Sequence, residues 1–324
     1  MLQLNSEQIV ALRPAVARPL PSAIPANVLE EVEAADVSGS VAEVLTILLR
    51  GSECTFRCTM CDLWKSTHLG PTPVGNLPEQ IRYALASRRI DQSRVRQQWI
   101  KLYNASNFFA PYNVPTEDLP AIAELVQSFD RVVVENHPLL TSARIKQFAS
   151  QLQGRLEVAM GLETVQPEAL ALLNKQVTIE ETRRATLTLV EQGIDVRLFV
   201  LLRPPGLTES AAIESCLASI EAARDWGARH VSIIPVRSGN GAMEHLERSG
   251  HFQPPLAASL ELVLQSSLAK SPMIVTADTW DWSQLRGLCP ACSIRRRTAI
   301  EQANLTQRSQ TLPLCEHCTH CNGS

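Results

Sequence analysis

Three cysteines lie within eight residues, in the stretch Cys54-Thr-Phe-Arg-Cys58-Thr-Met-Cys61. They follow an apolar run at residues 44–49 that is typical of a buried strand. An iron–sulfur cubane has four irons and normally binds four thiolates, but no further cysteine follows until Cys216. Three thiolates leave one iron with an open coordination position, where a metal site can do chemistry. The alternatives are a zinc knuckle, or a cluster whose fourth thiolate comes from a distant part of the chain.

The composition predicts a cytoplasmic protein with a sizeable core. Of its 324 residues, 45% are hydrophobic and 19% are charged, and the net charge of −3 gives no overall basic surface for nucleic acid. A mean hydropathy of −0.03 without a long uncharged apolar run argues against a membrane span, and the N-terminus lacks the pattern of a secretory signal. Nine cysteines gathered at two places indicate metal binding in a reducing compartment.

Strands and helices alternate along the region that carries these three cysteines. Apolar runs predict six strands, at 44–49, 98–104, 131–135, 156–161, 195–202 and 230–235. Helical periodicity lies between them, at 78–89, 116–128, 142–153, 179–192 and 209–226. This order requires parallel βαβ units, and the active sites of β/α barrels lie on loops after strand ends. We predict an α/β fold, a partial (β/α)6 TIM-like barrel, with a doubly wound open sheet as the alternative.

The spacing Cys-x3-Cys-x2-Cys after a first strand resembles the radical S-adenosylmethionine (SAM) superfamily. The resemblance implies that Cys54, Cys58 and Cys61 hold a catalytic 4Fe-4S cluster, with Met60 as the bulky apolar residue that the family has before the last cysteine. It implies that SAM binds the open iron and is cleaved by one electron to a 5′-deoxyadenosyl radical that abstracts a hydrogen from the substrate. A reductant such as flavodoxin or ferredoxin would supply that electron.

The same resemblance implies further contacts to SAM. Asn104 and Ser106 follow the second strand, where the family often has a glycine-rich motif for the SAM amino group, although here the motif lacks glycine. Glu163 ends the fourth strand in Gly-Leu-Glu-Thr, as in the branch typified by the Elongator catalytic subunit. Arg197 lies in the fifth strand and Arg203 directly follows it, and this strand lies beside the adenine in the family. Each of these residues also has a structural explanation. Asn104 and Ser106 could belong to an ordinary polar loop, Glu163 could cap the next helix, and Arg203 could be a solvated surface arginine.

Several phrases in sequence order resemble the archaeosine-biosynthesis radical SAM proteins, a subgroup of the Elongator-like branch. Besides the cysteines they are Lys-Leu-Tyr-Asn-Ala-Ser-Asn-Phe-Phe, Glu-Asn-His-Pro, Gly-Leu-Glu-Thr and Leu-Leu-Arg-Pro-Pro-Gly-Leu-Thr-Glu, within residues 41–240. The resemblance implies radical cleavage of a C–N bond in a lysine adduct on a tRNA deazaguanine, so a tRNA or nucleoside is an expected substrate. The alternatives are a radical SAM enzyme acting on a small metabolite and a non-enzymatic, zinc-stapled nucleic-acid-binding protein.

A second group of cysteines lies near the C-terminus. Its members are Cys289, Cys292, Cys315, Cys318 and Cys321. Cys-x2-Cys pairs separated by about twenty residues are typical of zinc sites, and four such thiolates would form a closed structural site. An auxiliary iron–sulfur cluster is the alternative. The chain is therefore expected to have an N-terminal extension (1–40) with a short helix near 26–35, a radical SAM core (41–240), and a helical, cysteine-rich, metal-binding segment (241–324).

Overall fold

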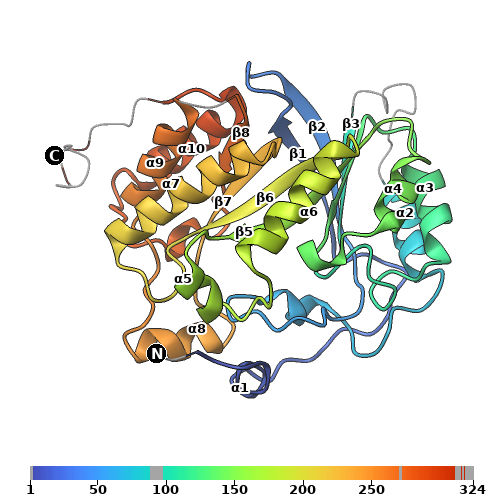
Figure 1. Ribbon diagram of the computed structural model, residues 1–324, viewed down its shortest axis with the longest axis horizontal. Coiled ribbons are helices and arrows are strands. Elements are labelled where there is room, and N and C mark those ends of the chain that lie inside the picture. The colour runs from blue at the N-terminus through green and yellow to red at the C-terminus, as the bar shows by residue number, and fades with distance from the viewer. Residues whose placement is uncertain (1–2, 88–97, 270–271, 311–314, 316, 318–324) are drawn as a thin grey trace.

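An eight-stranded sheet forms the centre of the molecule (Figure 1). The computed structural model describes residues 3–87, 98–269, 272–310, 315 and 317. The strands lie in sequence order across the sheet, with β1 antiparallel to β2 and all later neighbours parallel. They are β1 (Asn27–Ala34), β2 (Val41–Leu48), β3 (Gln98–Tyr103), β4 (Arg131–Glu135), β5 (Arg155–Glu163), β6 (Asp195–Leu202), β7 (His230–Pro235) and β8 (Ile274–Ala277).

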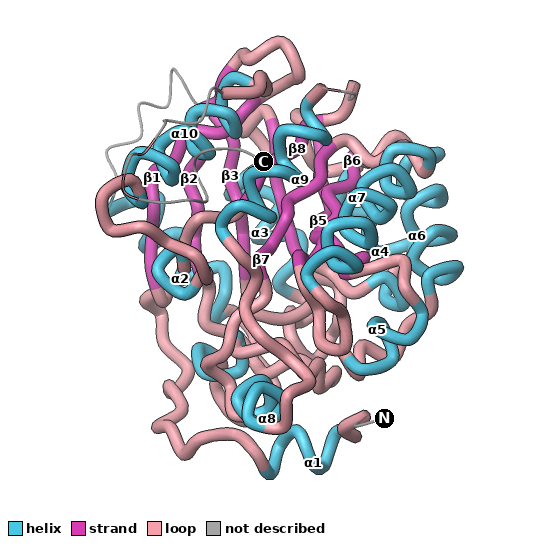
Figure 2. Tube along the Cα trace, turned by 90° about the vertical axis from the view of Figure 1, so that its left-hand side faces the viewer, coloured by secondary structure: helices cyan, strands magenta, loops and turns pink. Residues whose placement is uncertain are grey.

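Helices cover the outer face of this sheet, and loops gather at one end of it together with α1 and α8 (Figure 2). The helices are α1 (Ser6–Ala11), α2 (Asn76–Ser87), α3 (Asp118–Val126), α4 (Ala143–Ala149), α5 (Pro167–Leu172), α6 (Ile179–Glu191), α7 (Glu209–Asp225), α8 (Ala242–Arg248), α9 (Ala257–Leu268) and α10 (Ser293–Thr306). The parallel strands β2 to β7 and their crossover helices confirm the predicted α/β half-barrel. Within the described residues, no helix combines the length and apolar character that a membrane span needs.

The expected helix near 26–35 is wrong, because these residues form strand β1. Its residues pair with β2 along their whole length, from Asn27 opposite Leu48 to Ala34 opposite Val41. Glutamate and alanine favour helices, but the hydrogen bonds offered by the neighbouring strand outweigh this weak local preference. Two strands from outside the range 41–240, β1 and β8, thus extend the sheet on its two edges.

Helix α10 covers the gap between the two edge strands, since it packs against both β1 and β8. Asn304 donates to the Ala277 carbonyl and accepts from its N–H, both at 2.8 Å. Gln307 does the same for Val275, at 2.9 Å from the N–H and 3.1 Å from the carbonyl. The two side-chain amides therefore satisfy the open edge of β8, which would otherwise be free to pair with another strand.

Charged side chains fill the barrel interior at the amino ends of its parallel strands. Glu33 of β1 forms ion pairs with Lys101 of β3 and Arg197 of β6. Glu157 of β5 is fully buried and pairs with Arg197 at 2.7 Å and Arg131 at 3.0 Å. Burial of the two carboxyl groups would raise their pKa, but Arg197 and Lys101 hold the pKa of Glu33 below the usual range. Arg197, Arg131 and Arg229 do the same for Glu157. This network closes the barrel at the end away from the cysteine loop.

Candidate functional site

The loop after β2 carries Cys54, Cys58 and Cys61, all half-buried and free of disulfides. Side-chain amides from two other loops fix its backbone. Asn113 donates to the Glu53 carbonyl at 3.1 Å, and Asn240 donates to the carbonyls of Thr59 at 2.7 Å and Cys61 at 3.2 Å. An irregular segment has few internal hydrogen bonds, so these amide contacts define its path.

The three thiols suit a metal that binds soft ligands. Burial raises the pKa of Cys54 and Cys58, and it raises that of Cys61 to about 12. The thiols are therefore protonated near neutral pH unless a cation is bound, and metal binding would displace the protons. Two neighbours favour the anionic form, because Asn107 donates to the Cys54 sulfur at 3.1 Å and the Lys175 ammonium opposes the rise in the pKa of Cys58. The donor set fits a thiolate-bound iron–sulfur cluster.

Buried polar atoms without partners lie beside this loop, at the ends of β3 and β4. Asn104 is fully buried, and neither atom of its amide has a hydrogen-bond partner among the described residues. The Ser106 hydroxyl and the Oε2 atom of Glu135 are likewise without a partner in the described chain. Parallel pairing of Leu102 with Val134 places these strand ends side by side. Such unpaired groups cost free energy in a folded protein unless a bound polar molecule or water satisfies them.

Glu135 is the acidic member of this group. Burial raises its pKa to about 7, although the backbone N–H of Ala105 donates to the carboxylate and acts in the opposite direction. Ala105 has a positive φ of 54°, a strained conformation for a residue with a side chain. Glu135 is not among the residues predicted to contact SAM. The signal that could have found it is its place at the end of a parallel strand, in Arg131-Val-Val-Val-Glu135, because active sites of β/α barrels lie at such strand ends.

Glu163 ends β5 in the left-handed region, with φ of 65°, and its buried carboxylate forms an ion pair with Lys175. A side chain at Gly161 would overlap both the Glu163 carboxylate and the Lys175 ammonium, so the glycine leaves the space in which they meet. The Lys175 carbonyl lies 3.1 Å from Nε2 of His137. His137 stacks on Phe56 of the cysteine loop, with ring centroids 3.7 Å apart. The pair therefore belongs to the surroundings of the three thiols.

Lys175 was not found by sequence reasoning, because an isolated lysine in a helix-connecting turn resembles many solvated lysines. His137 has a structural role here. Its burial and the Lys175 charge lower its pKa to about 3, so the ring is neutral.

The other residues predicted to contact the cofactor are Arg197, Arg203 and Met60, and other side chains or carbonyls of the protein contact each of them. Arg197 sits near the amino end of β6, where it binds Glu33 and Glu157 inside the barrel. Arg203 pairs with Glu209 at 2.5 Å and donates to the Pro254 carbonyl at 3.0 Å. Met60 packs against an apolar cluster that includes Leu170, Leu173 and Met243.

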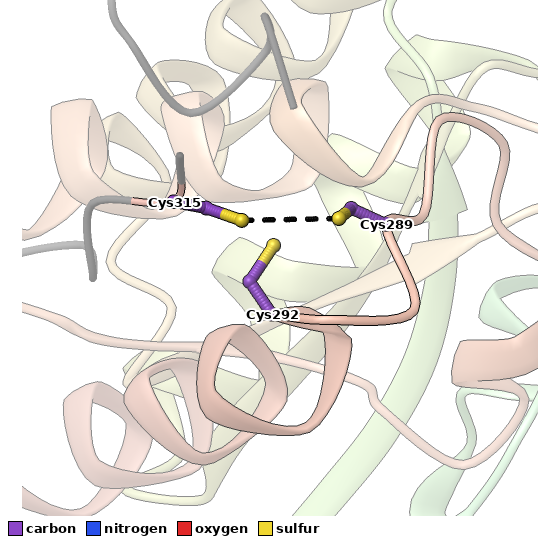
Figure 3. A group of neighbouring side chains, drawn as sticks. All are labelled: Cys289, Cys292 and Cys315. Carbon is purple, nitrogen blue, oxygen red and sulfur yellow. Dashed lines mark hydrogen bonds between the residues drawn. The ribbon is translucent and has the colours of Figure 1, made fainter. Parts of the chain in front are cut away.

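Cys289, Cys292 and Cys315 form a second group, and their sulfur atoms all lie within 4.8 Å of one another (Figure 3). All three side chains are buried. The sulfur atoms of Cys289 and Cys315 are 3.8 Å apart. Two thiolates bound tetrahedrally to one zinc at about 2.3 Å would be roughly 3.8 Å apart, so this spacing fits ligands of a single ion. The predicted ligands Cys318 and Cys321 lie outside the described residues.

Two curated proteins are similar to the chain over most of its length. One is an uncharacterized protein of Methanocaldococcus jannaschii, 23% identical over 294 residues, which covers 86% of this chain and 80% of the relative. The other is archaeosine synthase subunit beta of Methanosarcina acetivorans, 24% identical over 290 residues, with coverage of 85% and 82%. No protein-family model matches the chain.

Solved structures show the same architecture. Methylornithine synthase (PylB) aligns with a TM-score of 0.53 and 13% identity, over 80% of this chain and 68% of that one. Elp3 of Methanocaldococcus infernus aligns with a TM-score of 0.50 and 16% identity, over 70% of this chain and 59% of that one, so the chain spans less than two thirds of Elp3. Both are radical SAM enzymes. The chain has the fold of the radical SAM enzymes, as the spacing of Cys54, Cys58 and Cys61 predicted.

Proposed function

We propose that this chain is a radical SAM enzyme whose 4Fe-4S cluster is bound by Cys54, Cys58 and Cys61. The observation that carries the proposal is the position of these thiols, on a loop after β2 and beside the unpartnered buried polar atoms of β3 and β4. When bound, the cluster and SAM would supply a 5′-deoxyadenosyl radical for hydrogen abstraction. The chain itself supplies the thiolates, orients the cofactor and keeps water from the reacting atoms.

Polar groups of both signs at the strand ends suit SAM, which carries an ammonium, a carboxylate and ribose hydroxyls. Asn104 and Ser106 offer donors and acceptors that the described protein leaves free. Glu135 would accept from an ammonium or a hydroxyl. Lys175 pairs with Glu163 through one of the three N–H donors of its ammonium, so this buried group could also receive a carboxylate. Arg197 and Arg203 are engaged by protein partners, so the proposal does not include them.

The likeness to archaeosine synthase subunit beta supports a tRNA or nucleoside as substrate. We propose cleavage of a C–N bond in a modified nucleoside, with a flavodoxin or ferredoxin as the electron donor. Because that relative is named as a subunit, we also propose that this chain works with a second protein. At the C-terminus we propose one zinc ion bound by Cys289, Cys292 and Cys315, with Cys318 or Cys321 as the fourth ligand.

The direct test is reductive cleavage of SAM by protein reconstituted with iron and sulfide in the absence of oxygen. The wild-type chain should form 5′-deoxyadenosine when dithionite is added. The Cys58→Ala variant should lose this activity to background, because two thiolates do not hold the cluster. Cys216→Ala is the matched control, since Cys216 is a buried cysteine of α7 outside both groups and its loss should leave the activity intact.

Undiminished 5′-deoxyadenosine formation by Cys58→Ala, or a wild-type protein that takes up no iron, would contradict the proposal. The nucleoside substrate is tested separately. Mass spectrometry of tRNA nucleosides from a strain lacking the gene should show one modified nucleoside replaced by its precursor.

A further inference from the structure

Residues 4–18 lie across the end of the barrel at which the cysteine loop sits. Helix α1 of this segment lies near α8 (Figure 1). Leu4 and Ile9 are buried and form an apolar cluster with Ala242 of α8. Just before α8, Gly241 has φ of 91°, and a side chain there would overlap the carbonyl of Leu12. The segment is therefore packed tightly against the loop between β7 and α8.

Two arginines of this segment bind the cysteine loop. Arg13 pairs with Glu53 at 2.8 Å and Arg18 pairs with the same carboxylate at 3.0 Å. Glu53 directly precedes Cys54. Exposed fractions of 12%, 15% and 14% for these three side chains show that the ion pairs are shielded from water. Such shielding makes them stronger than exposed surface pairs, which contribute little.

The same arginines also reach the far side of the three cysteines. Arg18 donates to the carbonyl of Thr67 at 2.8 Å and to its hydroxyl at 2.6 Å. The guanidinium carbons of Arg13 and Arg18 lie 4.5 Å and 5.5 Å from the ring centroid of Trp64, within the range of cation–π attraction. Glu53 and Thr67 bracket the cysteines, so two side chains tie both ends of the loop to one segment.

A third contact joins the segment to the middle of the loop. Asn174 donates to the Ser6 hydroxyl at 3.1 Å and to the Arg57 carbonyl at 2.8 Å. Arg57 lies between Cys54 and Cys58, and its side chain also pairs with Glu53, at 3.3 Å. Three guanidinium groups thus share one carboxylate, which leaves an excess of positive charge beside the loop.

We propose that residues 4–18 form a strap that holds the cysteine loop in the shape that a cluster needs, with Arg13 and Arg18 as its positioning residues. An irregular loop loses much conformational entropy when three thiolates must be placed together. A strap that fixes both ends of the loop has already restricted these conformations before any metal binds. The role of the strap for the cluster rests on the proposed function, whereas its hold on the loop does not.

Hydrogen–deuterium exchange of the metal-free protein tests the strap without any cluster. In the Arg13→Gln/Arg18→Gln variant, amides of residues 52–67 should exchange about tenfold faster than in the wild type, since the variant loses charge-assisted hydrogen bonds at both ends of the loop. Arg155→Gln is the matched control, because Arg155 also forms an arginine–carboxylate pair, with Asp195, but at the opposite end of the barrel. It should leave exchange of residues 52–67 unchanged. Equal exchange in the double variant and the wild type would overturn the inference.

A second measurement connects the strap to the metal. After reconstitution, the double variant should release iron to a chelator on the order of tenfold faster than the wild type. Arg18→Gln alone keeps the pair of Arg13 with Glu53 and should show a smaller rise in both measurements; it replaces the double variant if that chain does not fold. If the double variant exchanged faster but the wild type took up no iron, the hold of the strap on the loop would stand and the proposed cluster would be excluded. Unchanged iron release with iron bound would overturn the role of the strap for the cluster.

Discussion

Two buried carboxyl groups at the mouth of the barrel differ in their partners. Glu163 is paired with Lys175, whereas one oxygen of Glu135 has no partner in the described chain and burial raises the pKa of that carboxyl to about 7. Near neutral pH Glu135 therefore exists in both protonation states. Only the charged state attracts a cation, so binding of a ligand ammonium at this carboxylate would depend on pH.

The Glu135→Gln substitution tests this assignment. For the wild type, affinity for SAM should increase as pH rises from 6 to 8, because the raised pKa of Glu135 is crossed and the carboxylate gains its charge. The variant should bind SAM about tenfold more weakly at pH 8, and its affinity should lack this increase. Titration calorimetry at pH 6 and pH 8 measures both effects. Glu191→Gln, on the exposed end of α6, is the control and should match the wild type; an unaltered pH dependence in Glu135→Gln would exclude the carboxyl from the site.

Predictions for single residues succeeded where the signal lay in residues close together in the sequence. The spacing of the three cysteines predicted the fold, whereas the contacts to SAM expected of Asn104, Ser106 and Glu163 stay predictions. Such signals did not reveal that Arg197 is engaged, because its partner Glu33 lies on a strand 164 residues away that the sequence did not predict. Pairing across a barrel interior depends on which strands face one another, and no short pattern encodes that.

Elements that close the barrel were the harder ones to foresee. Strand β1 contains glutamate and alanine residues that also suit a helix, and only its pairing with β2 decides between helix and strand. Asn304 of α10 and Gln307, which caps its C-terminal end, look in the sequence like ordinary polar surface residues. Their contact with the edge of β8 exists because α10 lies against both edge strands. Helix α10 thereby takes the place of a strand between β1 and β8, and side-chain amides take the place of the backbone groups that such a strand would offer to β8.

Replacement of Gln307 by alanine should weaken this closure. The substitution removes both partners of Val275 and leaves its buried N–H and carbonyl unsatisfied, at a cost of about 1–3 kcal/mol in the free energy of unfolding for each group. Urea denaturation followed by circular dichroism measures the loss. Gln302→Ala on the exposed face of the same helix is the control and should change stability by less than about 0.5 kcal/mol. Similar midpoints for the two variants would show that the edge of β8 does not need the amide.

Across the whole molecule, different interactions secure the two ends of the barrel. Ion pairs of Glu33 and Glu157 fill the end at which the parallel strands begin. At the other end the described side chains leave polar atoms free for a ligand, and residues 4–18 brace the cysteine loop. The second cysteine group flanks α10, with Cys289 and Cys292 just before the helix and Cys315 after it. A metal ion there would fix the helix that covers the gap between β1 and β8.

Loss of that metal should therefore loosen the barrel edge and spare the cysteine loop. Cys292→Ser should reduce bound zinc from about one ion per chain to near zero and keep about four irons, as measured by elemental analysis of reconstituted protein. Stability should fall by about 4 kcal/mol where free zinc exceeds its Kd a thousandfold. Exchange at 274–277 and 293–306 should rise, because α10 is no longer anchored, while exchange at 52–67 stays as in the wild type. The opposite result would be a wild-type protein that holds more than four irons and no zinc, and a Cys292→Ser variant that keeps only four irons. The site would then hold an auxiliary iron–sulfur cluster, and the 3.8 Å between the sulfurs of Cys289 and Cys315 would not describe its metal-bound form.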